Sequence, residues 1–416
     1  MRRVELISRT ERSNAISWSA FSTLQGLGSS FLSADLFNTV LMRRGASDFV
    51  LGLFAANQLV SLVAQFFAAR LIDRSRDKVR LAWWAFVIQL LPVLLPMTLL
   101  FLSGGEVDMW VFFAAVFAYY LVNYIASAFA SVAQMDLLSR VLRPDGRGKL
   151  LGLQGSLGGL AGIVGGLAVA STIQHLEYPT GYVTVWGMGL LVMLGGSLLI
   201  LRLRQLPGLR TRLRAESPHL RTALAAVTRD RRFMIFLLAV VARMGFSATQ
   251  YYIWPTARRL HGLPDEYVGY LVSVNSAIAM ISSPAIGWLA DRWGRAWTAL
   301  LFSIVAVAGF VFFPHAVSKE QLLVAYILIG IGTSGITMPL YLSVLELSPP
   351  EQRGLYVAVR YGTESGVYAL FLPLFGFCSM HFVPHVIFYT GALLAALAGL
   401  VLFCVAEGKK EIDTNG

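Results

Sequence analysis

The stretch GWLADRWGRA (287–296) places one acid, two arginines and two glycines between two long apolar segments. A related stretch, ARLIDRSRDKVR, occupies residues 69–80, and the Asp-Arg pairs of the two stretches align at an offset of 218 residues. The chain around them is 56% hydrophobic and only 14% charged, whereas a soluble domain typically carries about 25% charged residues. Both stretches therefore read as short polar connections between membrane-crossing segments of a repeated unit.

Apolar runs of membrane-crossing length recur along the whole chain. A helix of about 20 apolar residues crosses a hydrocarbon core of about 30 Å. We therefore predict an all-α membrane protein with twelve transmembrane helices, because the runs are too long and too numerous for a soluble core. The predicted spans are 15–42, 48–70, 81–103, 109–134, 150–172, 181–203, 233–257, 265–289, 297–314, 321–345, 355–377 and 384–406.

The basic residues predict the orientation of these spans. With the N-terminus inside, 27 of the 34 Lys and Arg residues fall on the cytoplasmic side and 5 in external loops. Such an asymmetry is typical of membrane proteins, so we expect both termini in the cytoplasm. The net charge of +11 then reports topology, and nucleic-acid binding is excluded as its explanation.

The longest cytoplasmic connection divides the chain into two halves. Residues 204–232 are arginine-rich and polar, and we predict a linker between a bundle of six helices over 1–203 and a second over 233–416. The halves share more than the opening stretch. RPDGRG (143–148) matches PPEQRG (349–354), and GASDFVLG before the second span loosely matches GLPDEYVG before the eighth. Three matches in the same order indicate a parallel 6+6 repeat.

These features together resemble the major facilitator superfamily of secondary transporters. That family carries a loop of the form Gly-x-x-x-Asp-Arg-x-Gly-Arg between spans 2 and 3, often echoed between spans 8 and 9. The echo is complete in this chain, while Ala69, Arg76 and Asp77 depart from the pattern in the first copy. The resemblance covers essentially the whole chain and implies two pseudo-symmetric six-helix bundles that work by alternating access.

The resemblance also implies that charged residues at the cytoplasmic ends of the spans control opening. We expect Arg292 and Arg295 to pair with Glu346, and Asp136 to pair with Arg74 or Arg147. The alternative is that these are ordinary positive-inside charges. The predicted gating residues are Asp73, Arg74, Asp136, Arg147, Gly287, Asp291, Arg292, Gly294, Arg295, Glu346 and Arg353. The glycine-rich span 152–166 lacks the Gly-Pro step typical of antiporters in the family, so close helix packing is its favoured interpretation.

A few ionisable residues lie deep inside the predicted spans, where charge is costly and usually functional. Arg243 lies about 16 Å into its span, at 1.5 Å per residue, and shares a face with Gln250. Arg360 and Glu364 are four residues apart on one helix face and either serve coupling or form a structural ion pair. Asp35 is a coupling candidate or lies at the outer mouth of its span.

Spans 1, 4, 7 and 10 line the central cavity in the resembled family. On that basis the predicted substrate-binding residues are Gln25, Tyr120, Asn123, Tyr124, Arg243 and Gln250, and the predicted coupling residues are Asp35, Arg360 and Glu364. The span-4 tyrosines serve either this cavity or packing. A cavity arginine favours a substrate with a carboxylate or phosphate, because guanidinium binds such groups with two parallel hydrogen bonds.

We therefore predict a proton-coupled secondary transporter of a small anionic or zwitterionic organic solute. The alternative is a multidrug or amphiphile efflux antiporter. No nucleotide-binding loop is found, the histidines are scattered, and neither an enzyme activity nor a cofactor or metal site is expected. A membrane enzyme and a sensor or scaffold on the same fold remain minor alternatives. The expected partners are the substrate, protons and membrane lipids around a monomer, and the expected location is a bacterial inner membrane.

Overall fold

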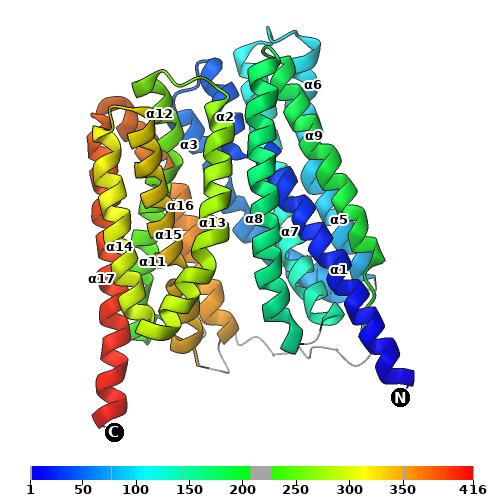
Figure 1. Cartoon of the computed structure of the whole chain (residues 1–416), viewed down its shortest axis with the longest axis vertical. Coiled ribbons are helices and arrows are strands. Elements are labelled where there is room, and N and C mark those ends of the chain that lie inside the picture. The colour runs from blue at the N-terminus through cyan, green and yellow to red at the C-terminus, as the bar shows by residue number, and fades with distance from the viewer. Residues whose placement is uncertain (1, 76, 143, 207–226, 350–352, 416) are drawn as a thin grey trace. The chain divides into compact units, whose positions relative to one another are not determined.

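The computed structural model places almost the whole chain in helices (Figure 1). It describes residues 2–75, 77–142, 144–206, 227–349 and 353–415. No strand occurs among these residues. Most of the predicted linker 204–232 lies outside the described residues.

Ten described segments are long and apolar enough to cross a membrane, each containing at least 18 residues. The two other predicted spans, 15–42 and 355–377, are helical as well, but they carry more polar residues. Helix α16 (Arg353–His381), which covers the predicted span 355–377, contains the charged residues Arg360 and Glu364. The predicted span 15–42 is interrupted after Phe31. The architecture confirms the predicted all-α membrane protein.

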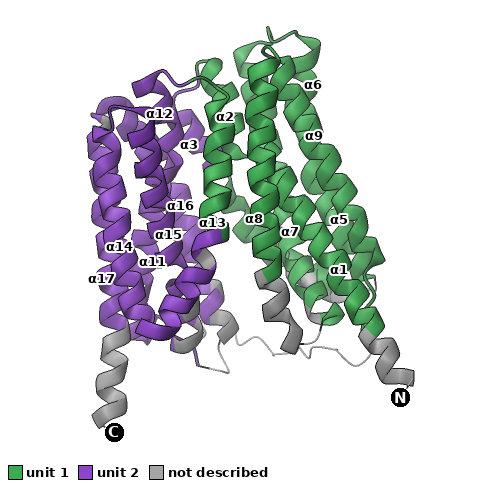
Figure 2. Cartoon of the chain, viewed as in Figure 1, with its two compact units in different colours: residues 1–45, 57–214, 264–280 green, residues 46–56, 215–263, 281–416 purple. Residues whose placement is uncertain are grey.

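The structure divides into two compact units (Figure 2). Unit 1 contains residues 1–45, 57–214 and 264–280. Within it, α1 packs against α8 and α9, and α4 and α5 pack against α7. Its elements are α1 (Arg2–Phe31), α2 (Ala34–Arg43), α4 (Gln58–Arg74), α5 (Lys78–Leu90), η1 (Leu91–Val93), α6 (Leu94–Leu102), α7 (Met109–Val141), α8 (Pro144–His175), α9 (Thr180–Ser197), η2 (Leu198–Arg202) and the first part of α13 (Tyr267–Trp293).

Unit 2 contains residues 46–56, 215–263 and 281–416. Here α14 packs against α15 and α17, α11 against α16 and α17, and α3 against α16. Its elements are α3 (Asp48–Ala56), α11 (Arg231–Tyr251), α12 (Ile253–His261), the second part of α13, α14 (Arg295–Phe312), η3 (Phe313–His315), α15 (Lys319–Leu347), α16 and α17 (Pro384–Asn415). Two short segments are thus exchanged: 46–56 joins the second repeat, and 264–280 joins the first.

Local sequence explains where helices end. Pro92 lacks an amide hydrogen, and the chain passes there from α5 through the short 3₁₀ turn η1 into α6. Gly262 caps α12 with φ of 57°, and Gly294 separates α13 from α14 with φ of 87°. Only glycine adopts this left-handed region without strain. The second glycine of GWLADRWGRA therefore makes the turn between two helices.

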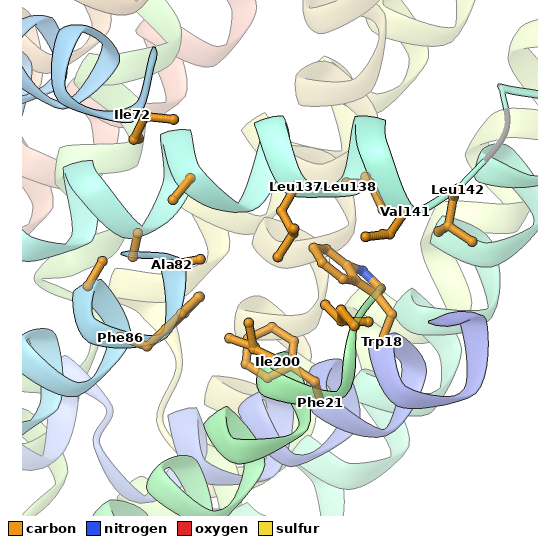
Figure 3. Packing of buried hydrophobic residues seen from close by; sticks show 14 of the residues in the cluster. Trp18, Phe21, Ile72, Ala82, Phe86, Leu137, Leu138, Val141, Leu142 and Ile200 are labelled. Carbon is orange, nitrogen blue, oxygen red and sulfur yellow. The ribbon is translucent and has the colours of Figure 1, made fainter. Parts of the chain in front are cut away.

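The core of unit 1 is built from large apolar side chains on facing helices (Figure 3). Trp18 and Phe21 of α1 are almost fully buried and pack edge to face with a ring-centroid distance of 6.1 Å. Phe21 also meets Phe86 of α5 edge to face at 5.1 Å. Aromatic pairs in this geometry contribute beyond their buried area. This cluster anchors the middle of α1.

Glycines bring other helices of unit 1 into close contact, as the sequence predicts for 152–166. A Cβ atom added to Gly159 of α8 would lie 2.7 Å from Cβ of Met280. At Gly26 of α1, an added Cβ would lie 2.7 Å from the carbonyl oxygen of Gly158. Small residues allow such approach in membrane helices, where packing replaces the hydrophobic effect as the driving force.

Substitution of Gly332 tests close packing in unit 2. A Cβ at this position of α15 would lie 2.5 Å from the backbone nitrogen of Ala306 on α14. We expect Gly332→Ala to lower stability by roughly 1–3 kcal/mol, because the neighbouring atom is backbone and cannot move aside. Thermal unfolding of the purified protein in detergent measures the effect. The control is Gly187→Ala in α9, where no atom lies within 4 Å; an equal loss in both variants would contradict the packing explanation.

Candidate substrate-binding site

Three ionisable side chains predicted from the sequence meet inside unit 2. Arg360 Nη2 donates a hydrogen bond to Glu364 Oε1 at 2.6 Å, one turn along α16. Arg243 of α11 approaches the same carboxylate oxygen, with its Nη1 at 3.8 Å. One carboxylate therefore faces two guanidinium groups, and the three side chains carry a formal charge of +1. A single acid partly neutralises two cations here.

The two arginines are held differently. Arg360 is 1% exposed, and its guanidinium carbon lies 3.8 Å from the ring centroid of Tyr341 and 5.0 Å from that of Tyr361. Cation–π contacts of this kind stabilise a charge that has lost its water. Arg243 is 17% exposed, and besides its 3.8 Å approach to Glu364 it makes a long contact with the sulfur of Met244, also at 3.8 Å. Arg360 is thus fixed, whereas Arg243 keeps bonding capacity.

Several buried donors around this cluster lack an acceptor among the described residues. They are Nε of Arg243, Nε of Arg360 and the hydroxyl of Ser247. Ser247 lies one helical turn from Arg243 on α11. A buried donor without a partner costs roughly 1–3 kcal/mol, so such groups usually serve a ligand or water. What this arrangement offers is hydrogen-bond donors and positive charge, suited to a ligand with acceptor oxygens.

Gln250, the third predicted residue of this α11 face, has a different environment. Its Oε1 accepts a hydrogen bond from Thr333 Oγ1 of α15 at 3.4 Å, and Thr333 is further bonded to Ile329 of its own helix. This long contact holds the amide loosely. Gln250 therefore stays a candidate at the edge of the Arg243 cluster.

The candidates of the first repeat lie in unit 1 and form a largely aromatic group. Tyr120 and Tyr124 stack with their centroids 5.9 Å apart, and Tyr119 stacks on Phe37 at 4.7 Å. Tyr119 is therefore a packing residue of this cluster. Asn123 donates from Nδ2 to the carbonyl of Gln89 at 3.1 Å, which ties α7 to α5.

Two further unit 1 candidates lie on the first predicted span. The Nε2 of Gln25 is buried without an acceptor among the described residues, so it remains a possible ligand group. Asp35 lies in the first turn of α2, just after the break that separates α1 from α2. The break makes the first predicted span two helices rather than one, and it places Asp35 at a helix N-terminus, where negative charge is favoured.

The predicted gating residues are only partly described. Asp136 accepts from Arg140 at 2.9 Å, and Lys78 Nζ lies 3.3 Å from the same carboxylate. The side chains of Asp73, Arg74, Arg147, Glu346 and Arg353 lie outside the described set, so their expected pairings remain predictions. Asp291 and Arg292 are exposed, and Arg292 lies over the ring of Trp288 at 5.4 Å. Arg295 is half-buried at the start of α14.

Gly287 has room for a side chain. A Cβ added there would lie 3.5 Å from the terminal carbon of Met338, an ordinary van der Waals contact. Of the two glycines in GWLADRWGRA, Gly294 is the one that the local backbone requires. The turn between α13 and α14 therefore depends on Gly294.

Sequence reasoning missed an ion pair at the start of α3. Asp48 is 1% exposed and receives two hydrogen bonds from Arg259 of α12, at 2.6 and 2.5 Å. Ser379 of α16 also donates to this carboxylate. The hydroxyl of Tyr252 donates to the carbonyl oxygens of Leu372, at 2.5 Å, and Asp48, at 3.3 Å. The buried carboxylate of Asp48 is therefore held by Arg259 and Ser379.

Unit 1 contains a similar ion pair. Asp265, just before α13, accepts from Arg43 and, at 2.7 Å, from the hydroxyl of Tyr182 on α9. Partial burial alone would lower the pKa of Arg43, but the hydrogen bond and the attraction of Asp265 raise the pKa above its ordinary value. The carboxylate is again the buried partner, at 5% exposure against 39% for the arginine.

The two pairs are reciprocal across the sequence repeat. Asp48 belongs to GASDFVLG and bonds an arginine of the second repeat; Asp265 belongs to the matching GLPDEYVG and bonds an arginine of the first. Each acid lies on one of the two exchanged segments, 46–56 and 264–280. The sequence contains a signal for these pairs. The two octapeptides match, and an arginine precedes each acid by five or six residues. We call these two contacts the reciprocal ion pairs.

Comparisons with known proteins agree with this architecture. The family model of the Major Facilitator Superfamily matches residues 13–345 and again 235–415. An MFS-type efflux transporter of Aspergillus flavipes is 32% identical over 169 residues, which cover 38% of this chain and 29% of that protein. The galactose-proton symporter of Escherichia coli K12 is 31% identical over 97 residues, covering 23% and 20%. The chain thus matches less than a third of the length of either relative.

Solved structures extend the likeness to the whole fold. The D-xylose-proton symporter superposes with a TM-score of 0.70 at 14% identity, over 95% of this chain and 97% of that one. A bacterial homologue of the iron transporter ferroportin, in its inward-facing state, gives a TM-score of 0.64 at 13% identity over 95% and 98%. At these identities the likeness concerns the fold alone. Together with the family match, it shows that the chain belongs to the Major Facilitator Superfamily of membrane transporters.

Proposed function

We propose that the chain is a secondary transporter that moves a small anionic or zwitterionic organic solute by alternating access, with protons as the coupling ion. The observation that carries the proposal is the cluster of Arg243, Arg360 and Glu364, with its positive charge and its unpaired buried donors. Guanidinium groups bind carboxylate or phosphate oxygens with two parallel hydrogen bonds. Arg243, which keeps free donors, is the proposed contact to the substrate.

Proton coupling is proposed for Glu364. It is the one carboxylate of the cluster, it is 7% exposed, and its ion pairs would change strength on protonation. Buried acids of this kind form proton relays in transporters. The similarity to a galactose-proton symporter supports a proton as coupling ion, although that protein moves a sugar.

Efflux of an amphiphile is the second candidate. It is supported by the similarity to an efflux transporter and by the stacked rings of Tyr120 and Tyr124. A site for lipophilic cations would favour an unpaired acid near aromatic rings, whereas Glu364 is bonded to Arg360. Because the cluster of Arg243, Arg360 and Glu364 is positively charged, efflux of a cationic amphiphile is the less favoured function.

The reciprocal ion pairs supply the proposed outer closure of the transport cycle. They lie at the helix ends that the charge asymmetry predicts to be external. Each one ties an exchanged segment of one repeat to helices of the other. In the proposed cycle, rocking of one repeat against the other on that side would separate each acid from the arginine of the opposite repeat.

Ligand-induced stabilisation tests the substrate class. We expect carboxylates or phosphates in a metabolite panel to raise the melting temperature of wild-type protein, whereas neutral sugars, inositol and lipophilic cations leave it unchanged. Arg243→Gln should weaken binding of the active anion by about tenfold or more, since a charge-assisted pair is worth roughly 1.5–3 kcal/mol. Arg243→Lys is the matched control that keeps the charge and loses the forked geometry. Stabilisation by a neutral solute that survives in Arg243→Gln would overturn the anionic assignment.

Transport in proteoliposomes tests the role of Glu364. The variant Glu364→Gln removes the titratable group and keeps its shape. We expect it to lose accumulation driven by a pH gradient while retaining exchange of labelled for unlabelled substrate. The conservative control Glu364→Asp should keep part of the accumulation. If gradient-driven accumulation is unchanged in the glutamine variant, Glu364 does not carry the proton.

The reciprocal ion pairs predict an asymmetry between single substitutions. Arg259→Gln leaves the carboxylate of Asp48, 1% exposed, without its cation and should cost roughly 1–3 kcal/mol of unfolding free energy. Asp48→Asn leaves an arginine that is 47% exposed and can be hydrated, so it should cost less. Thermal unfolding in detergent compares the two, with Arg43→Gln and Asp265→Asn as the parallel set. Equal losses, or a larger loss for the asparagine variants, would argue against this account.

A further inference from the structure

A polar pocket of about 570 Å³ lies in unit 1, where α1 meets the end of η2. None of its lining residues is among the substrate-binding, coupling or gating candidates described above. Three arginines and two hydroxyl groups dominate its walls. The lining residues are Arg9, Thr10, Ser13, Asn14, Leu201, Arg202 and Arg204.

The frame of this pocket is fixed by one buried amide. Asn14 is 1% exposed and donates from Nδ2 to the carbonyls of Val141, at 2.9 Å, and Arg204, at 2.8 Å. Its Oδ1 accepts the backbone N–H of Arg204 at 2.9 Å. These bonds join α1, the end of α7 and the chain after η2. The backbone that presents the arginines is therefore held by bonds across 127 and 190 residues of sequence.

The arginines of the pocket project outward from this frame. Leu203 and Leu206 are buried on either side of Arg204, which is itself exposed. The amide of Leu206 donates to the carbonyl of Arg140 at 2.9 Å and continues the anchoring. The exposed side chains of Arg202 and Arg204 thus leave an ordered segment and line the pocket together with Arg9 of α1.

The positive charge of the pocket is not balanced within the described part of the chain. Arg9, Arg202 and Arg204 make no ion pair with any described carboxylate. Glu11, the acid nearest in sequence, is not among the lining residues. Three like charges in one pocket repel one another, and an anion that bridges them removes that repulsion. Arginine is the preferred partner of phosphate because its donors match two oxygens at once.

An apolar track continues from the pocket along η2 and into α9. Leu201 lines the pocket and is exposed, as are Leu198 three residues earlier and Leu191 two turns before that. These leucines belong to Thr180–Arg202, one of the segments able to cross a membrane, so the track leads into the hydrocarbon region. At 1.5 Å per residue, it extends about 15 Å. A soluble phosphate compound would not use this track, whereas an acyl chain would.

We propose that this pocket binds the phosphate headgroup of an anionic phospholipid, with an acyl chain along Leu201, Leu198 and Leu191. Basic pockets beside membrane helices commonly bind lipid headgroups, because the charges meet the phosphate at interfacial depth. Ser13 supplies a hydroxyl donor for a further headgroup oxygen. The bound lipid holds the N-terminal part of α1 to the chain that follows η2, at the point where the first repeat ends.

The test counts lipids bound to the full chain by native mass spectrometry. The probes are dioleoyl phosphatidylglycerol, dioleoyl phosphatidylcholine and soluble glycerol 1-phosphate, each titrated into detergent-purified protein. For wild type we expect one phosphatidylglycerol bound at least tenfold more tightly than phosphatidylcholine, and little binding of glycerol phosphate. The triple variant Arg9→Gln/Arg202→Gln/Arg204→Gln should lose this preference.

A matched variant controls for total charge. Arg12→Gln/Arg229→Gln/Arg231→Gln removes three exposed arginines that do not line the pocket, and it should bind phosphatidylglycerol like wild type. The single variant Arg202→Gln covers the case in which the triple variant folds poorly. Equal phosphatidylglycerol binding by both triple variants overturns the proposal, and equally tight binding of glycerol phosphate turns the site into one for soluble anions. The readout is lipid binding, so its outcome is independent of whether the transport proposal holds.

Discussion

The cost of an unpaired charge in hydrocarbon is the constraint on which the rest of this structure depends. A membrane offers no water to hydrate an ion or to satisfy a free backbone group, so the chain folds almost entirely into helices. The ionisable groups that enter the spans must then find partners on neighbouring helices. Arg360 does so with Glu364 and with two tyrosine rings. Where buried donors lack such partners among the described residues, as at Arg243 and Ser247, they remain available to a ligand or to water.

The same constraint shapes the reciprocal ion pairs. Asp48 and Asp265 are nearly inaccessible to water, and each is satisfied by an arginine together with a hydroxyl group, from Ser379 or Tyr182. Because the acids occupy equivalent places in the repeat and bond to the opposite repeat, a duplicated six-helix unit generates two such contacts from one sequence feature. The contacts also explain why segments 46–56 and 264–280 pack with the partner repeat. The sequence repeat thus leads each repeat to pack one short segment against the other repeat.

Much of the fold could be predicted because its signals are local. Apolar runs gave the spans, the Lys and Arg asymmetry predicted their orientation, and the octapeptide matches indicated the repeat. Arg360 and Glu364 could be paired from their four-residue spacing alone. The break before α2 could not be foreseen, because Leu32 and Ser33 carry no strong helix-breaking signal. The contacts of Arg243 with Glu364 and of Asp48 with Arg259 span 121 and 211 residues, and only packing brings them together.

Within the proposed function, the position of Glu364 between two guanidinium groups bears on the direction of coupling. Its Oε1 lies 2.6 Å from Arg360 and 3.8 Å from Arg243, so an anion that binds Arg243 competes with this carboxylate for the same N–H groups. Protonation of Glu364 removes the competitor and raises the formal charge of the cluster from +1 to +2. Each ligand therefore strengthens binding of the other, because linkage is reciprocal. An exchanger needs the opposite, a proton and a substrate that displace one another, so this charge arrangement favours movement of anion and proton in the same direction.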